Sequence, residues 1–551
     1  MLSFGLLPNN FQWLIKHCPV FPINGSKVRV ITEPNEFYSE LISKASKARN
    51  RISLSSLYLG TGKLEENLVS TLLNRAAECQ DLKIHWLLDF TRGSRGVHNS
   101  RTMLQPLIAS HPQTCSKTTT RLSTPLHTSK PTHSQHMSTP KALTQQVHTT
   151  AVSLASVFYA THPQVSLYHT PNLRGFLKWL IPQRWNEVIG LQHMKLYVFD
   201  DSLIMSGANL SNDYFTNRQD RYVAIENCPA LADFYHRLIG AVSRYSLQLH
   251  EDNSTNMLPD VNVHPFLGDY AKYCMAMKQS VEKMWNEECE KNLTRLRQIN
   301  QVTEGSSLNH GDPVNNSSTK SADSSVAELD TLVFPTVELG PFNLVNDSLV
   351  TNLLFESAED HAKIQLASGY FNLTEEYKNC ILEKSKANFG ILMAHPTANG
   401  FLGAHGVAGG IPAAYTLIAK RFFNKIQQNN IQRVELFEYQ RPKWTFHGKG
   451  LWYYKPDQSL PFLTMIGSPN FGRRSVNRDL ESQLVIMTSN HPLQTALHGE
   501  QHHLYSSANL VTRQTFTQAD RLVPYWLGQG VHRKPPQLRM TPLSGRLESN
   551  P

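Results

Sequence analysis

One short chemical pattern occurs twice in this chain of 551 residues. His193 and Lys195 are followed by a small polar turn at 206–209, and His447 and Lys449 by a similar turn at 467–470. Residues two apart on a β-strand point to the same face, so each histidine and its lysine can project toward one anionic group. The pattern predicts a single active site built from two halves of the chain.

The residue types in this pattern suit phosphoryl transfer without an obligatory metal. An imidazole can attack phosphorus or deliver a proton, and an ammonium group neutralises phosphate oxygens. The turns bring backbone amides and the side chains of Ser206, Asn209, Ser468 and Asn470 within reach of the same oxygens. A single histidine–lysine pattern of this kind often arises by chance. Two copies, each followed by such a turn and a charged stretch, indicate a functional site.

A second internal repeat supports a duplicated fold. Residues 51–59 resemble residues 363–371, and each copy precedes its histidine–lysine pattern. Both copies begin with a basic residue and an apolar strand, and both lead into helix-like sequence at 64–73 or 375–384. Strands that alternate with helices predict an α/β fold in which mixed sheets are flanked by helices.

The two halves differ by an insertion. Ser56 lies 137 residues before His193, whereas the matching Ser368 lies only 79 residues before His447. The excess falls at about 111–163, where Ser, Thr, His, Pro and Gln dominate and apolar periodicity is lost. This segment is expected to be a disordered loop, and its histidines lack the spacing of a metal site.

Composition changes divide the chain further. The expected parts are an N-terminal segment at 1–27, a first domain at 28–300, a linker at 301–328, a second domain at 329–521 and a mobile tail at 522–551. A hydrophobic content of 40% is ample for two cores.

The net charge of +9 favours anionic partners, either nucleic acid or an acidic membrane surface. No tract interleaves basic residues with base-stacking aromatics, so no nucleic acid is expected. No run of eighteen apolar residues occurs, and a lipid substrate would be met from the membrane surface by a peripheral protein. Residues 1–24 lack the Arg- and Ser-rich character of a transit peptide and indicate no compartment.

Longer strings carry a resemblance to a known family. They lie at 55–62, 87–96, 190–195, 206–211, 214–222 and 444–452. With the paired sites, they make the chain resemble the phospholipase D superfamily and, within it, the eukaryotic phosphatidylglycerophosphate synthases. The resemblance runs from about Val28 to Arg521, except for the insertion and the linker. It implies two duplicated phospholipase D-like α/β domains with one shared active site at their interface.

The resemblance also implies an activity. Family members transfer a phosphatidyl group from CDP-diacylglycerol to sn-glycerol 3-phosphate and release CMP, at the mitochondrial inner membrane, as the committed step toward phosphatidylglycerol and cardiolipin. His193 would attack the lipid-bearing phosphorus, and His447 would protonate the departing CMP and then act as base for the glycerol hydroxyl. No cofactor is required for this chemistry.

Supporting roles follow from the same resemblance. Lys195, Lys449, Asn209 and Asn470 would hold the phosphate oxygens. Asp220 and Glu481, by their position after the turns, are candidates for the carboxylate that fixes the tautomer of each histidine. The family's aspartate five residues after the lysine is Asp200, which forms a triad with His193 and Lys195 and is usually structural. Tyr454 takes that position in the second half, which predicts reduced symmetry.

Two further groups of residues are weaker candidates. One strand end could line the CDP or phosphate pocket, and the arginines after the second turn could hold the phosphate dianion of the acceptor. The first group is Ser55, Ser56, Leu57, Tyr58, Leu59, Gly60, Thr61 and Gly62; the second is Arg473, Arg474 and Arg478.

Several alternatives stay open. ATP binding is disfavoured because the glycines near Lys63 lack the spacing of a P-loop, and divalent-cation stimulation is a further possibility. A phosphodiesterase acting on phospholipid or nucleic acid would share the chemistry and differ in the acceptor. A silent lipid-binding scaffold is disfavoured because both histidines and both lysines are present.

Overall fold

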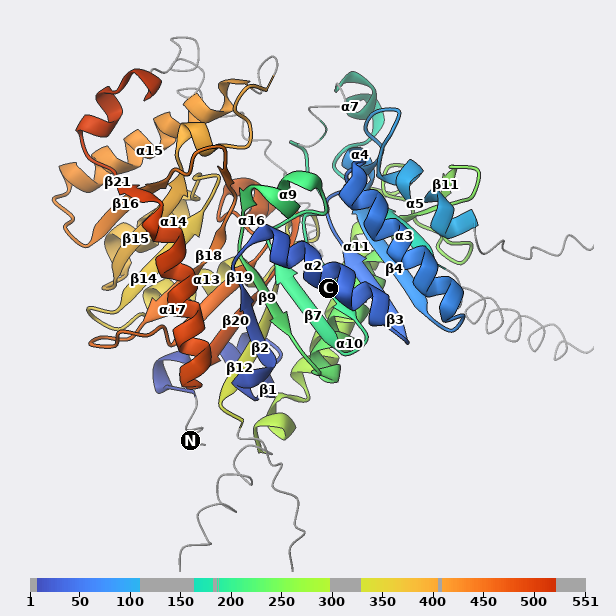
Figure 1. Ribbon diagram of the computed structural model, residues 1–551, viewed down its shortest axis with the longest axis horizontal. Coiled ribbons are helices and arrows are strands. Elements are labelled where there is room, and N and C mark those ends of the chain that lie inside the picture. Colours follow the sequence, from blue (N-terminus) through green and yellow to red (C-terminus); the bar gives the residue numbers. More distant parts are fainter. Residues whose placement is uncertain are drawn as a thin grey trace, which may run out of the picture.

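The computed structural model describes residues 7–109, 163–181, 186, 188–297, 329–404 and 409–521 (Figure 1). The predicted linker at 301–328 and tail at 522–551 lie outside the described residues, as does the predicted insertion except for its last residue. Within the described residues, no helix is both long enough and apolar enough to cross a membrane.

Two large mixed sheets form the frame of the molecule, one from each half of the chain (Figure 1). The first sheet has the order β11-β10-β5-β4-β3-β6-β7-β9-β2. Its strands are β2 (Val28–Ile31), β3 (Arg51–Ser55), β4 (Lys83–Asp89), β5 (Gln164–Tyr168), β6 (Leu196–Phe199), β7 (Ser202–Ser206), β9 (Tyr222–Ile225), β10 (Leu247–Leu249) and β11 (Thr255–Asn256).

The second sheet has the order β1-β12-β20-β19-β18-β14-β15-β16-β21, with β13 paired to β12. Its strands are β1 (Phe21–Ile23), β12 (Thr331–Leu339), β13 (Leu344–Val345), β14 (Lys363–Ser368), β15 (Asn388–Ala394), β16 (Val434–Tyr439), β18 (Lys449–Tyr454), β19 (Leu463–Gly467), β20 (Leu480–Thr488) and β21 (Ala508–Leu510).

The two sheets repeat one topology. The series β2-β9-β7-β6-β3-β4-β5-β10 has the same order as β12-β20-β19-β18-β14-β15-β16-β21. The repeated segments at 51–59 and 363–371 contain β3 and β14. Each of these strands pairs in parallel with the next strand, β4 or β15, and antiparallel with the strand that begins at or directly after the lysine, β6 or β18. The duplicated α/β fold predicted from the sequence is therefore confirmed.

Helices cover the sheets in matching positions. The first half contains α2 (Pro34–Lys47), α3 (Lys63–Glu78), α4 (Phe90–Gly93), α5 (Ser100–Ala109), α7 (Gly175–Leu180), α9 (Asn212–Thr216), α10 (Pro229–Ser243) and α11 (Tyr270–Cys289). Associated with the second sheet are α1 (Leu14–His17), α13 (Asn346–Glu356), α14 (Glu375–Asn379) with the π-helix η4 (Cys380–Lys384), α15 (Ile411–Gln428), α16 (Arg473–Asn477) and α17 (His491–Ser506).

Local sequence explains where these helices start and which face they bury. Proline at the first helical position opens α2 and α10, where its missing N–H is not needed. In α2 the apolar residues Phe37, Leu41 and Ala45 recur every fourth position, so they form one buried stripe.

Three hydrophobic clusters hold the halves together and build each outer layer. The central cluster contains residues from both sheets and from α10, α11 and α17. The second cluster joins the second half to residues of the N-terminal segment and to Leu296. The third cluster lies within the first half. Strand β1 pairs Phe21 with Val333 of β12, so the predicted N-terminal segment at 1–27 contributes a strand to the second sheet.

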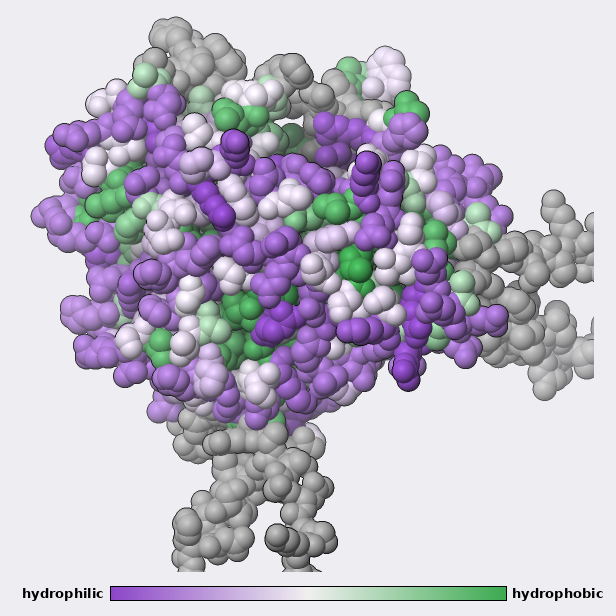
Figure 2. Space-filling model, in the orientation of Figure 1, coloured by the Kyte–Doolittle hydropathy of each residue, from purple (hydrophilic) through white to green (hydrophobic). Residues whose placement is uncertain are grey.

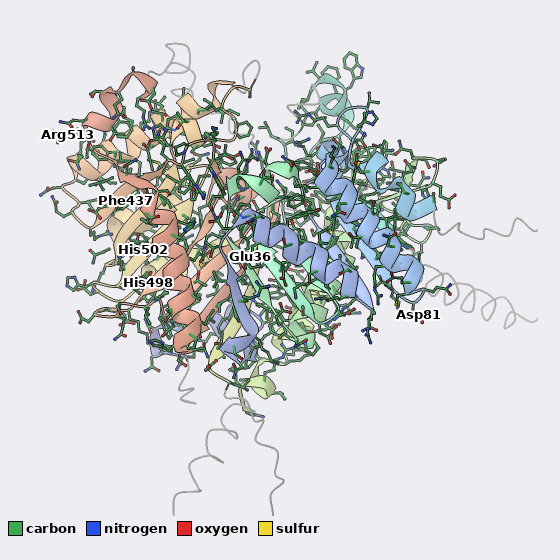
Figure 3. The ribbon with its side chains drawn as sticks, viewed as in Figure 1. Glu36, Asp81, Phe437, His498, His502 and Arg513 are labelled. Carbon is green, nitrogen blue, oxygen red and sulfur yellow. The ribbon has the colours of Figure 1, made fainter. Side chains whose placement is uncertain are left out.

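The two halves also meet along a seam where α17 packs against β2, the strand that precedes α2. His503 Nε2 lies 3.2 Å from the Glu33 carboxylate, which precedes α2. Figure 3 labels Glu36 on α2 and His498 and His502 on α17, on the near face of the two halves. This seam lets residues from each half occupy fixed positions relative to the other.

Candidate active site

Short backbone pairings cross between the halves and set the register of the site. Strand β8 (Arg218–Gln219) pairs in parallel with β17 (Thr445–Phe446). The His447 backbone N–H donates to the Gln219 carbonyl at 2.7 Å, and the His193 N–H donates to the Leu480 carbonyl at 2.9 Å. Asp220 directly follows Gln219, and Glu481 directly follows Leu480. Each histidine is therefore placed opposite a carboxylate of the other half.

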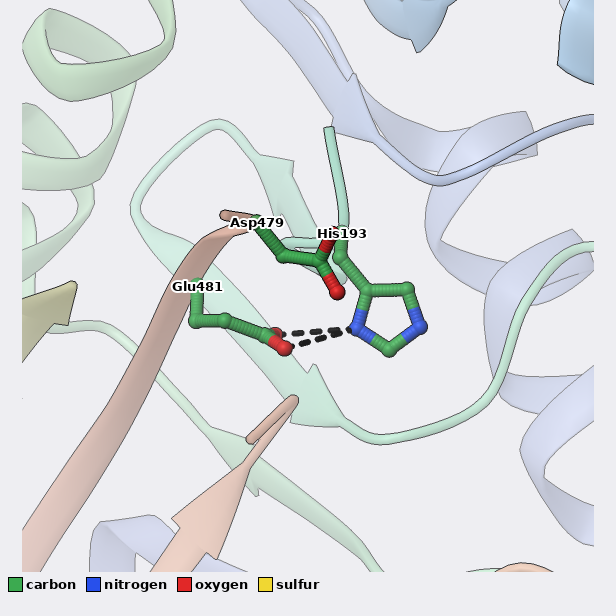
Figure 4. Close-up of side chains that lie close together, drawn as sticks. All are labelled: His193, Asp479 and Glu481. Atoms are coloured by element: carbon green, nitrogen blue, oxygen red, sulfur yellow. Dashed lines mark hydrogen bonds and ion pairs between the residues drawn. The ribbon is translucent and has the colours of Figure 1, made fainter. Parts of the chain in front are cut away.

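The first histidine pairs with the carboxylate of the second half. His193 Nδ1 lies 3.0 Å from both oxygens of Glu481, which also accepts a hydrogen bond from Ser468. In Figure 4 the other ring nitrogen points away from both carboxylates drawn there. Burial and the nearby Lys195 hold the pKa of His193 well below its usual range. The ring is therefore neutral, with Nε2 carrying the lone pair.

The second histidine pairs with the carboxylate of the first half. His447 Nδ1 lies 2.6 Å from Asp220 Oδ2, and the Tyr214 hydroxyl lies 3.3 Å from Nε2. The rings of Tyr214 and Tyr370 stand edge-on to the imidazole, at centroid distances of 5.0 and 5.2 Å. Burial, Lys449 and other nearby cations lower the pKa of His447 well below its usual range.

The two lysines lie buried beneath the histidines. Each Nζ donates to the carbonyl of its own histidine at 2.6 Å. Lys449 Nζ also lies 3.4 Å from Asp220. Burial lowers the pKa of Lys449 to about 8 and that of Lys195 well below its usual value, and carboxylates from both halves oppose these shifts. Both lysines therefore belong to one shared electrostatic unit.

A cavity of about 620 Å³ opens onto both histidines. Asn209 and Asn470 line it from equivalent turns, and their amide oxygens are buried without a partner in the described part of the chain. Arginines are the most frequent charged lining residues: Arg92, Arg95, Arg218 and Arg474. A cavity with two histidines, two amides and four guanidinium groups is suited to an anionic, phosphate-bearing ligand.

The predicted turn serines support the site without lining the cavity. The Ser206 hydroxyl donates to the Arg221 carbonyl at 2.7 Å and accepts from the Ala208 N–H at 2.9 Å. The Ser468 hydroxyl donates to Glu481. Both are fully buried. Their role as phosphate contacts is therefore corrected to that of fixing the turn and the carboxylate.

The structure corrects the grouping of Asp200 with His193 and Lys195, because its carboxylate bonds to backbone groups away from the site. Asp200 lies in the turn after β6, at the end of the strand remote from Lys195, with a left-handed φ of 48°. Its carboxylate accepts backbone N–H groups from Arg49, Asn50 and Arg51 at 2.7 to 3.0 Å. It therefore anchors the start of β3, which is the structural role that the family resemblance implied.

Most of the predicted nucleotide segment lies away from the cavity. Leu57 and Tyr58 line it, and the Arg92 guanidinium group lies 4.0 Å over the Tyr58 ring. The Ser55 hydroxyl instead accepts from the Gln192 side chain at 2.8 Å. The prediction is corrected for the remaining members, which hold the strand end or begin α3: Ser55, Ser56, Leu59, Gly60, Thr61 and Gly62.

Of the three arginines predicted to hold the phosphate of the acceptor, only one lines the cavity. Arg474 lines the cavity and pairs with Asp479 at 2.9 Å. Arg473 and Arg478 do not line it, and Arg478 donates to the Val188 carbonyl at 2.8 Å. Neighbouring positions on the short helix α16 point in different directions, so only one of its two arginines can face the cavity.

Several residues of the site were not found from the sequence. Tyr214, Tyr370, Arg218 and Asp479 line the cavity. An alignment of the two turns on Asn209 and Asn470 would have signalled some of them, because Arg218 and Asp479 take equivalent positions. Because Arg218 is positive and Asp479 is negative, the two positions do not look equivalent in the sequence.

A buried ion pair beneath Lys449 was also missed. Arg221 from the first half reaches into the second, where its guanidinium group pairs with Glu500 at 2.8 Å and lies 3.7 Å over the Trp452 ring. Gly450, at a left-handed φ of 109°, makes room for it, since a Cβ there would lie 2.6 Å from Arg221 Nη1. This contact holds the two halves of the site in register.

His193, Asp479 and Glu481 are close enough to be considered as a metal site, with donor atoms within 4.8 Å of one another (Figure 4). Each donor is already engaged, however. His193 Nδ1 bonds to Glu481, and the Asp479 carboxylate accepts from Arg474 and from the Leu191 N–H. The two carboxylates of the cluster are therefore held by hydrogen bonds to His193 Nδ1, Ser468, Arg474 and the Leu191 N–H.

Relatives of known name align with more than nine-tenths of this chain. No family model matches it. It is 42% identical over 530 residues to the mitochondrial CDP-diacylglycerol–glycerol-3-phosphate 3-phosphatidyltransferase of Gallus gallus, covering 94% of this chain and 85% of that protein. The protein of the same name from Homo sapiens is 42% identical over 526 residues, with 94% and 84% covered. A probable enzyme of this kind from Dictyostelium discoideum is 34% identical over 521 residues, with 92% and 77% covered.

One solved structure shows the same fold along most of the chain. A phosphatidylserine synthase from Haemophilus influenzae superposes with a TM-score of 0.60 and covers 94% of each chain. At 17% identity, this likeness concerns the fold alone.

Proposed function

This chain belongs to the family of CDP-diacylglycerol–glycerol-3-phosphate 3-phosphatidyltransferases, and we propose that it works through a covalent phosphohistidine on His193. It is a mitochondrial enzyme of phosphatidylglycerol and cardiolipin biosynthesis, which transfers a phosphatidyl group from CDP-diacylglycerol to glycerol 3-phosphate. The crossed pairing of each histidine with a carboxylate of the other half is the observation that carries the proposed mechanism.

The first step joins the lipid-bearing phosphorus to His193. Glu481 accepts a hydrogen bond from Nδ1–H, so the Nε2 lone pair is directed at the substrate. The bond from phosphorus to the CMP oxygen breaks, and His447 donates a proton to that oxygen. Burial disfavours a charged His447, so the anionic diphosphate of the substrate must stabilise its protonated form.

The second step reverses these roles at His447. The imidazole, now neutral, takes the proton of the glycerol hydroxyl, and the resulting oxygen attacks phosphorus. The bond from phosphorus to His193 Nε2 breaks, which releases phosphatidylglycerophosphate and restores the neutral nucleophile. Asp220 holds His447 in one orientation through both steps, because its Oδ2 lies 2.6 Å from Nδ1.

Positive charge from both halves stabilises the transition state. Lys195 and Lys449 are buried next to the histidines, where the anionic diphosphate of the substrate favours their charged forms and a charge acts more strongly than in water. The same lysines supply the charge that a divalent cation would otherwise provide at the reacting phosphorus. No metal or ATP takes part in the proposed steps, and the tests of that proposal are activity in the presence of a chelator and activity without added nucleotide.

The acceptor phosphate is proposed to bind among the cavity arginines. Arg474 carries over from the sequence prediction, and Arg92, Arg95 and Arg218 line the same cavity. Guanidinium groups suit a phosphate dianion because they donate in a planar fork. Binding of this dianion would also favour the glycerol hydroxyl over water, which separates a transferase from a hydrolase.

The lipid substrate implies a membrane partner. We propose that the protein acts as a peripheral protein of the inner mitochondrial membrane, with its basic net charge of +9 favouring an anionic lipid surface. Nucleic acid is not a proposed partner.

Isotope exchange tests the covalent step without the acceptor. Purified protein is incubated with CDP-diacylglycerol and labelled CMP in the absence of glycerol 3-phosphate. A reversible phosphatidyl-enzyme returns label to CDP-diacylglycerol, and His193→Gln abolishes this return. His236→Gln, a substitution remote from the cavity, serves as the matched control because His236 bonds to Ser53 instead. Complete transfer without any exchange would contradict the covalent route, and phosphatidic acid as the main product with acceptor present would indicate a hydrolase.

A further inference from the structure

Helix α7 has the opposite polarity from that expected of a helix on a protein surface. Phe176 and Trp179 are 71% and 80% exposed, and Leu180 is 58% exposed. The cations of this segment turn inward: Lys178 Nζ lies 3.0 Å from the centroid of the Phe266 ring, and Arg174 donates to the Gly268 carbonyl. Apolar groups face solvent while charged groups face the protein.

We propose that α7 is a membrane-docking element that inserts its aromatic residues into the surface of a bilayer containing anionic phospholipid. This inference rests on the proposed function, because it locates the surface through which the lipid substrate reaches the cavity. Phe, Trp and Leu on one exposed face are the residue types that bury in the headgroup and acyl boundary of a membrane. Figure 2 shows hydrophobic residues on the projection that carries α7, at the top of the view.

Ring contacts connect α7 to the wall of the cavity. Phe266, on which Lys178 rests, packs against His169 at a centroid distance of 4.6 Å. His169 in turn packs against Phe90, the first residue of α4, at 5.4 Å. Helix α4 carries Arg92, which lines the cavity. A membrane that holds α7 is therefore held next to the arginines proposed to bind phosphate.

A second exposed apolar residue marks the other wall of the cavity. Leu402 is 59% exposed. Its neighbour Phe401 lines the cavity and packs against Tyr370, at a centroid distance of 5.3 Å. Tyr370 in turn contacts the ring of His447. Apolar side chains thus project from segments on both walls, and acyl chains could remain in the bilayer while the diphosphate enters the cavity.

A second copy of this chain is the alternative occupant of α7. A stable protein interface buries about 800 Å² on each partner and involves roughly 20–30 residues a side. Helix α7 has six residues. A lipid surface needs no complementary shape, so a few aromatic side chains suffice for it.

Vesicle binding by the full chain tests the proposal. The variant is Phe176→Glu/Trp179→Glu, and the control is Leu293→Glu/Leu349→Glu, which adds the same charge at exposed leucines outside α7 and the cavity lining. Each protein is sedimented with vesicles of phosphatidylcholine and phosphatidylglycerol. We expect the α7 variant to bind at least about tenfold more weakly than the wild type and the control to bind nearly as well, because burying one aromatic side chain gives more than a tenfold gain.

Transfer to glycerol 3-phosphate from a short-chain, fully dispersed CDP-diacylglycerol separates docking from catalysis. The α7 variant should match the wild type on this substrate and lose activity on long-chain substrate in vesicles. Equal vesicle binding by variant and wild type would overturn the proposal. So would a wild-type dimer in solution that the α7 variant alone disrupts. If the wild type bound vesicles but transferred nothing from the dispersed substrate, the proposed function would fail while the docking surface stood.

Discussion

Ser475 lines the cavity and bonds to Glu481, the partner of His193, whereas the equivalent residue of the first half is Tyr214, whose ring and hydroxyl both contact the His447 imidazole. The carboxylate partner is nevertheless the same kind of group at the same ring nitrogen in both. One histidine therefore keeps space beside it for a bulky phosphorus centre, while the other is fixed between aromatic rings as a proton carrier.

The charges next to the two histidines also differ. Asp213 pairs with Arg218 in the first half, and Arg474 pairs with Asp479 in the second, so equivalent positions carry opposite charges. Asp479 raises the pKa of His193, against the larger lowering effect of burial, whereas Arg218 lowers the pKa of His447 further. The reversal places a carboxylate among the charges that act on the proposed nucleophile and a guanidinium group among those that act on the proposed acid.

The largest expected effect separates the nucleophile from the acid. His193→Gln and His447→Gln should each lower transfer from CDP-diacylglycerol by about 10⁴-fold or more, as is typical when a residue that acts directly is removed. With a lipid analogue whose leaving group needs no proton, such as a nitrophenyl phosphodiester, His447→Gln should still release one leaving group per enzyme. Rapid-quench measurement of that burst checks the prediction. A burst from His193→Gln would contradict the assignment of roles.

The crossed carboxylates give the next effect in size. Glu481→Gln and Asp220→Asn should each lower kcat by roughly 10²- to 10⁴-fold, because a neutral amide no longer fixes the histidine tautomer. Each variant should behave like the glutamine variant of the histidine that its carboxylate contacts in the other half. With the nitrophenyl analogue, Asp220→Asn should therefore keep the burst of nitrophenol and Glu481→Gln should lose it. The reverse pattern would show that each carboxylate serves the histidine of its own half.

Much of this arrangement could be read from the sequence, because repeated strings report repeated structure. The duplicated fold, both histidines and both lysines followed from local patterns of two to nine residues. The contact between Asp220 and His447 could not be predicted from such patterns. It depends on which backbone segments of the two domains pair, and these segments lie far apart in the chain. Ser206 and Ser468 seem equivalent because each is the serine of its turn. When the two turns are aligned on Asn209 and Asn470, however, the serines differ by one position.

The contact that joins the halves should dominate stability. Glu500→Gln removes the negative charge that pairs with the buried Arg221 guanidinium group. This loss should lower the free energy of unfolding by about 3–5 kcal/mol. Chemical denaturation measures this loss. Asp260→Asn, which removes the exposed partner of Arg244, should change it by roughly 0–1 kcal/mol. Equal effects from the two substitutions would show that the crossing contact does not hold the halves together.

The smallest effect is a shift in pH dependence. Lys449, with a pKa of about 8, is charged below that pH and neutral above it, so kcat/KM should fall as the pH rises through about 8. Lys449→Arg cannot lose its charge in this range, and its residual activity should lack that alkaline limb. A pH profile of both proteins makes the comparison. An unchanged limb in Lys449→Arg would assign the titration to another group.

The site of the covalent phosphatidyl group tests the division of labour between the two histidines most directly. Wild type is mixed with CDP-diacylglycerol, and His447→Gln with the nitrophenyl phosphodiester analogue, both without acceptor. Each reaction is quenched under alkaline conditions that preserve phosphohistidine, and the digested peptides are mapped by mass spectrometry. The account predicts the phosphatidyl group on the peptide that contains His193 and on no other. A modified His447 in the wild type, or transfer that proceeds with neither histidine modified, would contradict it.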